Sequence, residues 1–196
     1  SSVIISTSGR SSSKARYTAL LKDLNLKDTI NYKTFETDKS VIDPVDFVAV
    51  IRSDDVHCIG AAISKDIKAG IIPFLDELDQ SASAVNSCNT VINDNGRLIG
   101  YNTDYLGFKI AIESTIIKKD IKIAIIYGYG GVSLCVVNAL KSLGLNSKSI
   151  YITGRNLEKA AIRAQALGVS VWKSNDIDID VDVDVDVDVD VDVDVD

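Results

Sequence analysis

Two arrangements of apolar residues alternate along this chain. Short continuous apolar runs predict buried strands, and apolar residues three or four positions apart predict helices with one buried face. The predicted strands are Val3–Ser6, Tyr32–Glu36, Cys58–Ile63, a strand within Val85–Ile92, Arg97–Tyr101, Ile121–Tyr127 and Ser149–Thr153. The predicted helices are Ala15–Leu24, Val45–Ile51, Ile67–Leu78, Tyr105–Ile117 and Leu134–Leu143. This alternation predicts an α/β fold with a mainly parallel sheet.

Turn residues refine this picture. Asn25 tolerates the left-handed conformation and is expected to end the first helix. Pro44 is expected in the first turn of the second helix. The segment Asn93–Gly96 predicts a tight hairpin and therefore one antiparallel strand. A new β-α-β-α pattern begins after Asp120, so we expect a domain boundary there and a second unit over residues 121–175.

The last 21 residues, 176–196, alternate strictly between Asp and Ile or Val. The alternation matches a strand with one apolar face, but a carboxylate at every second position repels its neighbours. We therefore expect this low-complexity tail to be disordered. A calcium-binding role is the alternative, yet calcium loops need glycine turns, which the repeat lacks.

Composition and charge narrow the classes of function. Hydrophobic residues make up 46% and charged residues 25% of the chain, as in ordinary globular proteins. No apolar run approaches the roughly 18 residues needed to cross a bilayer. The net charge is -7, but 11 of the 28 acidic residues belong to the tail, and the remaining chain is mildly basic. That balance suits anionic small molecules and is too weak to indicate nucleic acid.

The cysteines and the start of the chain bear on its compartment. Cys58, Cys88 and Cys135 are widely spaced and form no metal-type pair, so we expect reduced thiols and no metal site. No charged and apolar leader precedes the first strand, which favours a cytoplasmic setting. The chain contains no Met, which is typical of a fragment or a processed protein.

A glycine-rich turn follows the strand Ile121–Tyr127 and precedes a helix, with the sequence Gly128-Tyr129-Gly130-Gly131-Val132-Ser133. In a dinucleotide-binding turn, the first glycine permits the tight turn and the second lets a pyrophosphate approach the backbone. The helix N-terminus then presents N–H groups to the phosphates. Ser133 replaces the usual third glycine and is small enough for the same packing. We therefore expect residues 128–132 to contact a dinucleotide.

The next strand, Ser149–Thr153, ends at Gly154-Arg155-Asn156. An NAD-binding domain commonly has an acidic residue here for the ribose 2′-hydroxyl, whereas an arginine favours a 2′-phosphate. We therefore expect Arg155 and Asn156 to bind the adenosine end of NADP. A structural role of Arg155 in the loop is the alternative.

Polar residues also gather at predicted strand ends in the first part of the chain. They are Lys68, Ser87-Cys88-Asn89-Thr90 and Asn102-Thr103-Asp104. Taken alone, Lys68 would be a solvated lysine near the start of a helix and Asp104 a helix N-cap. Their shared position at strand ends, where α/β proteins bind ligands, favours a common site.

Four segments resemble, in order and spacing, those of shikimate dehydrogenases: Ile63-Ser64-Lys65-Asp66-Ile67-Lys68, Asn89-Thr90-Val91, Asn102-Thr103-Asp104 and Gly128-Tyr129-Gly130-Gly131. The resemblance covers roughly residues 3–170, and Ser8-Gly9-Arg10 and Tyr105 look closer to the shikimate-dehydrogenase-like branch. It implies a substrate-binding domain at 1–104, a connecting helix at 105–120 and part of a Rossmann NADP-binding domain at 121–175. It also implies a C-terminal truncation, because such enzymes continue with the rest of the cofactor sheet.

The resemblance implies a function as well. Shikimate dehydrogenases reduce 3-dehydroshikimate to shikimate with NADPH, in the shikimate pathway to aromatic amino acids, or catalyse the reverse oxidation. By this resemblance, Lys68 handles the hydroxyl proton and Asp104 partners it. Ser64, Asn89 and Thr90 are implied to contact the substrate.

The substrate carboxylate is implied to be bound by serines at the start of the first helix. Ser11 and Ser13 are the first choice, and Ser6 and Ser8 are the alternative pair if the loop length differs. The His-Asn pair of that helix in the family becomes Tyr17-Thr18 here.

A second departure follows the third strand. The usual Asn-Val-Thr-x-Pro-x-Lys becomes Ala62-Ile63-Ser64-Lys65-Asp66-Ile67-Lys68, which keeps the lysine and a hydroxyl. The sequence leaves open whether shikimate or quinate is preferred, whether the protein is a monomer or a homodimer, and whether the short chain is active. A noncatalytic binding protein for a shikimate- or quinate-like acid is the alternative function.

Overall fold

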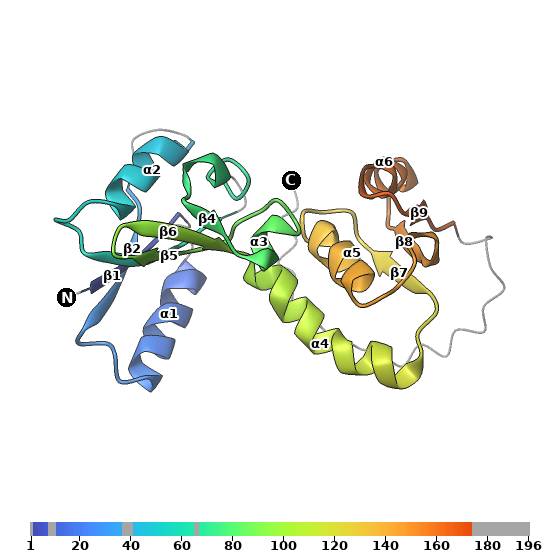
Figure 1. Ribbon diagram of the computed structural model, residues 1–196, viewed down its shortest axis with the longest axis horizontal. Helices are drawn as coiled ribbons and strands as arrows, with labels where there is room; N and C mark the ends of the chain where they lie inside the picture. The colour runs from blue at the N-terminus through green and yellow to red at the C-terminus, as the bar shows by residue number, and fades with distance from the viewer. Residues whose placement is uncertain (1, 8–10, 37–40, 65–66, 174–196) are drawn as a thin grey trace.

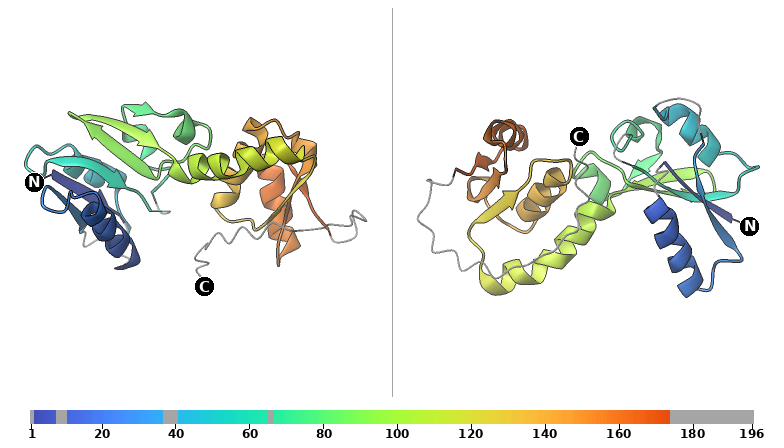
Figure 2. Two further views of the ribbon diagram at one scale, coloured as in Figure 1. Left: turned by 90° about the horizontal axis from the view of Figure 1, so that it is seen from below. Right: turned by 180° about the vertical axis from the view of Figure 1, so that it is seen from behind.

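The computed structural model describes residues 2–7, 11–36, 41–64 and 67–173. Its strands form two sheets, and the long helix α4 (Thr103–Lys119) leads from the first to the second (Figure 1). Figure 2 shows from two further sides that the sheets lie at opposite ends of the molecule. The tail at 176–196 lies outside the described residues, and the division into domains at 104 and 120 stays a prediction.

The larger sheet contains β1 (Ser2–Ser6), β2 (Ile30–Thr34), β3 (Cys58–Ala62), β4 (Glu77–Leu78), β5 (Thr90–Asp94) and β6 (Arg97–Tyr101). Their order is β2-β1-β3-β5-β6-β4. Only β5 is antiparallel to its neighbours, so five strands run one way and β5 runs against them. The α/β class and the single antiparallel strand are therefore confirmed. Asn95 and Gly96 have φ of 52° and 92°, as a tight hairpin turn requires.

Helices cover both faces of this sheet. They are α1 (Ser11–Asp23), α2 (Pro44–Ile51) and the short α3 (Gln80–Ser83), with a 3₁₀ turn η1 (Ile72–Phe74). α1 and α2 lie on opposite sides of the sheet (Figure 1). On one face, Phe47 and Ile51 of α2 are fully buried in one apolar cluster with Val3 of β1. On the other, Tyr17 of α1 stacks on Tyr32 of β2 with ring centroids 4.5 Å apart.

Two predicted helix boundaries are confirmed, and both follow from local chemistry. The side chain of Asp43 accepts a hydrogen bond from Val45 N at 2.9 Å and caps α2, whose first turn contains Pro44. Asn25 follows α1 with a φ of 57°. The short polar side chain of asparagine tolerates this left-handed conformation, so the chain turns there toward β2.

The helix expected over Ile67–Leu78 is wrong. This segment forms turns, η1 and β4 instead. Pro73 lacks an N–H, and its ring clashes with the preceding turn of an α-helix. Asp76 is also held at the sheet, because its N–H donates to Leu98 O at 3.0 Å and its carboxylate accepts from Leu98 N at 2.7 Å. Pairing with β6 thus overrides the helical spacing, and Lys68 lies in a turn rather than near a helix start.

The smaller sheet consists of three parallel strands in the order β7 (Ala124–Tyr127), β8 (Ile150–Thr153) and β9 (Ser170–Val171). Its helices are α5 (Val132–Ser142) and α6 (Leu157–Leu167), with a 3₁₀ turn η2 (Ser147–Ser149) before β8. The expected β-α-β-α order is observed, and β9 extends it by one strand. None of the described helices is long and apolar enough to span a membrane.

Both helices of the smaller sheet pack on the same face. Ile150 and Ile152 of β8 are fully buried in a cluster with Val137 of α5 and Ala160 of α6. Alternate residues of a strand point to opposite faces. Accordingly Tyr127 of β7, which is in register with Thr153, points away from the helices and is 75% exposed.

Candidate active site

The larger sheet gathers the predicted polar residues at one edge. β1, β3 and β6 run in the same direction, and β5 runs against them, so its first residues lie beside the ends of the others. Thr7 follows β1, Ser64 follows β3, Asn89 precedes β5, and Asp104 follows β6. Parallel α/β sheets bind ligands at this edge.

The structure brings Lys68 and Asp104 together. Lys68 Nζ donates to Asp104 Oδ2 at 2.8 Å, and the two side chains are 26% and 38% exposed. The Lys68 carbonyl accepts from Cys88 N at 2.8 Å, which ties the turn to the sheet. A partly exposed ion pair adds little to stability. We therefore expect this pair to contribute little to the free energy of unfolding, and its catalytic roles stay a prediction.

Asp104 is not the cap of α4. Asn102, 1% exposed, occupies that position, and its Oδ1 accepts from Tyr105 N at 2.9 Å. Asn102 Nδ2 donates to Ser87 O at 2.9 Å, which fixes the start of the helix. The capping alternative for Asp104 is therefore wrong. Its carboxylate lies in the first turn of α4, where the helix dipole favours negative charge.

Asn89 holds the strand ends beside this pair. Its Oδ1 accepts from Thr103 N and from Thr90 Oγ1, both at 2.9 Å, and its Nδ2 donates to Thr103 Oγ1 at 3.0 Å. Its backbone carbonyl accepts from Ile63 N at 2.8 Å, and its N–H donates to Tyr101 O at 3.0 Å. Asn89 therefore fixes the ends of β3 and β6 and the start of β5 relative to one another. Thr103 also belongs to this network; sequence reasoning named it within the segment Asn102-Thr103-Asp104 but gave it no role in the site.

Ser64 pairs with Thr7, a residue that sequence reasoning missed. Thr7 Oγ1 donates to Ser64 Oγ at 2.9 Å and accepts from Ser64 N at 2.6 Å. Thr7 is 8% exposed. Its place directly after β1 parallels the place of Ser64 after β3, and this parallel is the signal that could have found it.

The serine candidates for a carboxylate are less well placed by the structure. Ser6 is 1% exposed and lies within β1. Ser8 lies outside the described residues, as do the side chains of Ser11 and Ser13, whose backbone begins α1. Neither serine pair is tested, and both assignments stay predictions.

The predicted nucleotide turn lies at the carboxyl end of β7. Gly128 has a φ of 137°, which glycine adopts without strain, and its N–H donates to Thr153 O at 2.8 Å. A Cβ added to Gly130 or Gly131 would meet no atom of the described chain within 4 Å. α5 begins at the exposed Val132 without a side-chain cap. The turn therefore offers the open space and the uncapped helix N-terminus that a phosphate-binding turn needs.

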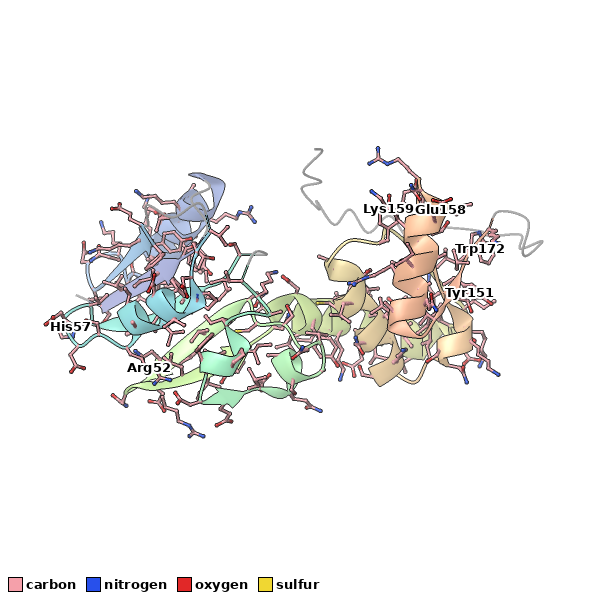
Figure 3. The ribbon with its side chains drawn as sticks, turned by 90° about the horizontal axis from the view of Figure 1, so that it is seen from above. Arg52, His57, Tyr151, Glu158, Lys159 and Trp172 are labelled. Carbon is pink, nitrogen blue, oxygen red and sulfur yellow. The ribbon has the colours of Figure 1, made fainter. Side chains whose placement is uncertain are left out.

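The residues that follow β8 lie beside the predicted nucleotide turn. A Cβ added to Gly154 would lie 2.9 Å from Tyr129 Cε1, so the tyrosine ring covers this glycine. Arg155 is exposed, and Asn156 Oδ1 accepts from Lys159 N at 2.9 Å and caps α6. Figure 3 shows Lys159 and its neighbour Glu158 projecting from the first turn of α6. Nucleotide contacts of Tyr129, Val132, Arg155 and Asn156 stay predictions.

Other candidate features lie apart from these two edges. Among the described residues, no group of three or more His, Cys, Asp or Glu side chains is arranged to hold a metal ion. The three cysteines are free and buried, and burial raises the pKa of each thiol. A hollow of about 610 Å³ follows the edge strand β2, but none of the predicted site residues lines it.

The chain is similar to curated shikimate dehydrogenases, although no family model matches it. A shikimate dehydrogenase-like protein of Haemophilus influenzae is 40% identical over 109 residues, which are 56% of this chain and 39% of that protein. A shikimate dehydrogenase (NADP(+)) of Methanococcus maripaludis is 32% identical over 164 residues, 82% of this chain and 54% of that protein. The chain thus spans 39% and 54% of the length of these two relatives.

A solved structure shows the same arrangement. A shikimate 5-dehydrogenase-like protein superposes with a TM-score of 0.70 at 31% identity, covering 88% of this chain and 60% of that one. Because the match covers 88% of the chain, it extends beyond the larger sheet and α4 into the smaller sheet.

Proposed function

Because the chain belongs to the shikimate dehydrogenase family, we propose that it supplies the substrate site, and half of the cofactor site, of an NADP-dependent oxidoreductase that interconverts 3-dehydroshikimate and shikimate. The observation that carries this proposal is the 2.8 Å contact between Lys68 Nζ and Asp104 Oδ2 at the carboxyl edge of the larger sheet. A cytoplasmic setting and a monomeric or homodimeric state belong to the same proposal.

Lys68 carries the proton chemistry in this proposal. NADPH, when bound, supplies the hydride. During reduction, the Lys68 ammonium donates a hydrogen bond to the ketone oxygen and stabilises the negative charge that develops there. It then gives its proton to that oxygen, which completes the hydroxyl group, and water restores the lysine proton. Asp104 orients the ammonium and compensates its charge. In the oxidation the steps reverse, and Lys68 takes up the hydroxyl proton.

The neighbouring polar residues position the substrate. We assign the substrate hydroxyls to Ser64, Asn89 and Thr90, which border the pair at the same edge. Each of them already takes part in hydrogen bonds with its neighbours, so their positions are set before a ligand arrives. Ser11 and Ser13 are assigned to the substrate carboxylate.

The residues of the smaller sheet fit the adenosine-phosphate part of NADP. Gly130 and Gly131 leave space for the diphosphate, and Arg155 lies at the end of β8, where a 2′-phosphate would be bound. The described residues form one β-α-β-α-β half of a doubly wound sheet, in which β7, β8 and β9 correspond to the first three strands. The nicotinamide end would need the other half, so we expect this chain to bind NADP weakly.

A noncatalytic binding role for a shikimate- or quinate-like acid is the second candidate. The polar residues at the ends of the larger sheet's strands all lie within β1 to α4, whereas the helices α5 and α6 cover only one face of the smaller sheet. This difference favours the second candidate, which needs the first group of residues alone. A chain of this kind would bind the polyhydroxylated acid without NADP.

Separate calorimetric titrations with shikimate and with NADP test the proposal. We expect shikimate to bind, and Lys68→Ala to weaken that binding about tenfold or more, because it removes a charge-assisted hydrogen bond. Lys122→Ala is a matched control. Lys122 also pairs with an aspartate, Asp120, at 2.6 Å, but the two side chains are 75% and 80% exposed.

The outcomes separate the two candidates. Binding of both ligands, with NADP weaker, supports the oxidoreductase. Binding of shikimate without NADP supports the noncatalytic role. Absence of shikimate binding at millimolar concentration, or an equal loss in Lys68→Ala and Lys122→Ala, overturns the site.

A further inference from the structure

The guanidinium of Arg163 reaches from α6 to the glycine turn. Arg163 Nε donates to Ser133 Oγ at 2.9 Å, and Nη2 donates to the carbonyl oxygens of Gly130 and Gly131, each at 3.4 Å. Ser133 is 5% exposed, and its hydroxyl donates to Gly130 O at 2.7 Å. A side chain 30 residues away in sequence therefore holds the turn at three of its atoms.

This position is electrostatically unfavourable in the free protein. Arg163 lies beside the N-terminus of α5, the positive end of the helix dipole, where a cation is disfavoured. In the part of the chain that the structure describes, no carboxylate forms an ion pair with Arg163. The carbonyl groups of the turn are thus the partners that keep this half-buried guanidinium in place.

The hydrogen bonds from Arg163 to these carbonyl groups also set the direction in which the turn's N–H groups point. In a trans peptide, the C=O and the following N–H point in opposite directions, and the described chain has no cis peptide bond. Because Gly130 O and Gly131 O face Arg163, the N–H groups of Gly131 and Val132 point away from it. The open space beside Gly130 and Gly131 shows that no side chain of the described residues blocks the turn there.

We propose that Arg163 is a positioning residue for the diphosphate of a dinucleotide. It fixes the peptide planes of the glycine turn so that the N–H groups of Gly131 and Val132 face the ligand, and it acts through these groups rather than by touching the ligand. This inference rests on the proposed function, because the ligand is the one assigned there. The two arginines then have different roles: Arg155 binds the 2′-phosphate, and Arg163 orients the turn that binds the diphosphate.

Two nucleotide ligands distinguish the proposed role of Arg163 from that of Arg155. ADP carries the diphosphate without a 2′-phosphate, and adenosine 2′-monophosphate carries the 2′-phosphate without a diphosphate. Arg163→Leu, which keeps an apolar stem, should weaken ADP binding about tenfold and leave the 2′-monophosphate unchanged. Arg155→Leu should do the reverse. Arg163→Lys should restore part of the ADP affinity, because one donor to the carbonyls returns.

Lys148→Leu is the charge-matched control. It removes one exposed positive charge in η2, at the amino end of β8 and away from the turn, and should change neither affinity. An equal loss of ADP binding in Lys148→Leu and Arg163→Leu would mean that net charge alone matters, which overturns the inference.

Hydrogen exchange without ligand makes the test independent of the proposed function. Ser133 N donates to Gly130 O and Leu134 N donates to Gly131 O, the two carbonyls that Arg163 holds. Arg163→Leu should speed exchange at both amides, and unchanged exchange overturns the inference whether or not a nucleotide binds. Faster exchange with unchanged ADP affinity would leave Arg163 a structural role only. Failure of the wild-type chain to bind ADP would overturn the cofactor assignment instead.

Discussion

The two sheets differ in how completely their faces are covered. The larger one has α1 and α2 on opposite faces and a buried cluster around Phe47 and Ile51. The smaller one has α5 and α6 on a single face, and Ile125 and Tyr127 on the other face are 40% and 75% exposed. Parallel sheets are normally covered on both faces. Among the described residues, the larger sheet is thus covered by helices on both faces, whereas the smaller sheet has one face covered and one exposed.

The glycines of the two sheets show the same contrast. A Cβ added to Gly60 would lie 2.7 Å from Val91 O, and one added to Gly100 would lie 2.6 Å from Leu75 Cδ1. In the larger sheet, glycine therefore allows close packing. A Cβ added to Gly130 meets nothing within 4 Å among the described residues. In the turn after β7, glycine therefore keeps space open, which is what a bound phosphate requires.

Removal of a large ring from each sheet should give the largest difference. Phe47→Ala empties a fully buried position and should cost about 3–5 kcal/mol of unfolding free energy. Tyr127→Ala removes a ring that is 75% exposed and should cost less than about 0.5 kcal/mol. Urea titrations followed by far-UV circular dichroism measure both. Similar losses would contradict the comparison by showing that the open face is covered in solution.

Glycine substitutions should give a smaller but more specific difference. Gly100→Ala should cost about 1–3 kcal/mol, because the new methyl group overlaps Leu75 and crowds Cys88. Gly130→Ala should change stability by less than about 0.5 kcal/mol but weaken ADP binding, because the methyl group enters the space assigned to phosphate. Calorimetry with ADP and urea titration separate the two effects. Unweakened ADP binding in Gly130→Ala would show that the phosphates lie elsewhere.

Much of the fold could be predicted, because the apolar runs and turn residues act locally. Arg97–Tyr101 was predicted with both of its boundaries, since a hairpin turn and a polar segment limit it. The helix over Ile67–Leu78 was wrong, because hydrogen bonds between Asp76 and Leu98 join residues far apart in sequence. The four-residue α3 and the two-residue β9 are too short for periodicity to reveal.

The candidate site likewise contains residues that the sequence could identify and residues that it could not. Lys68 and Asp104 could be singled out because each follows a predicted strand and matches a family segment. Thr7 could not be singled out, and Thr103 was named without a role, because both act through contacts between segments that are far apart in the sequence. Arg163 looks like an ordinary helical arginine until α6 is packed beside α5.

Acid should affect the larger sheet through Asp76, with a modest effect because the residue is exposed. Hydrogen bonds, first from Leu98 N–H and then from the Arg52 guanidinium, hold the pKa of Asp76 below its ordinary value. A carboxyl group whose pKa is lower when folded stabilises the fold above its unfolded pKa of about 3.9. That contribution is lost as the pH falls through the lower, folded value. Asp76→Asn should therefore reduce stability at pH 7 and flatten its decline in acid.

The smaller sheet supplies the internal reference for this last test. Trp172, the single tryptophan, packs edge-on against Tyr151 of β8 with ring centroids 5.4 Å apart, and Figure 3 shows the two together. Its fluorescence follows the smaller sheet, whereas far-UV circular dichroism follows both. Urea titrations at neutral pH and near pH 3 should show the effect of Asp76→Asn in the dichroism and little change in the fluorescence. Asp120→Asn is the control, because Asp120 pairs only with an exposed lysine among the described residues, and water screens such pairs. An equal effect of Asp76→Asn on both signals would mean that the two sheets unfold together, and that the difference in coverage does not make them separate folding units.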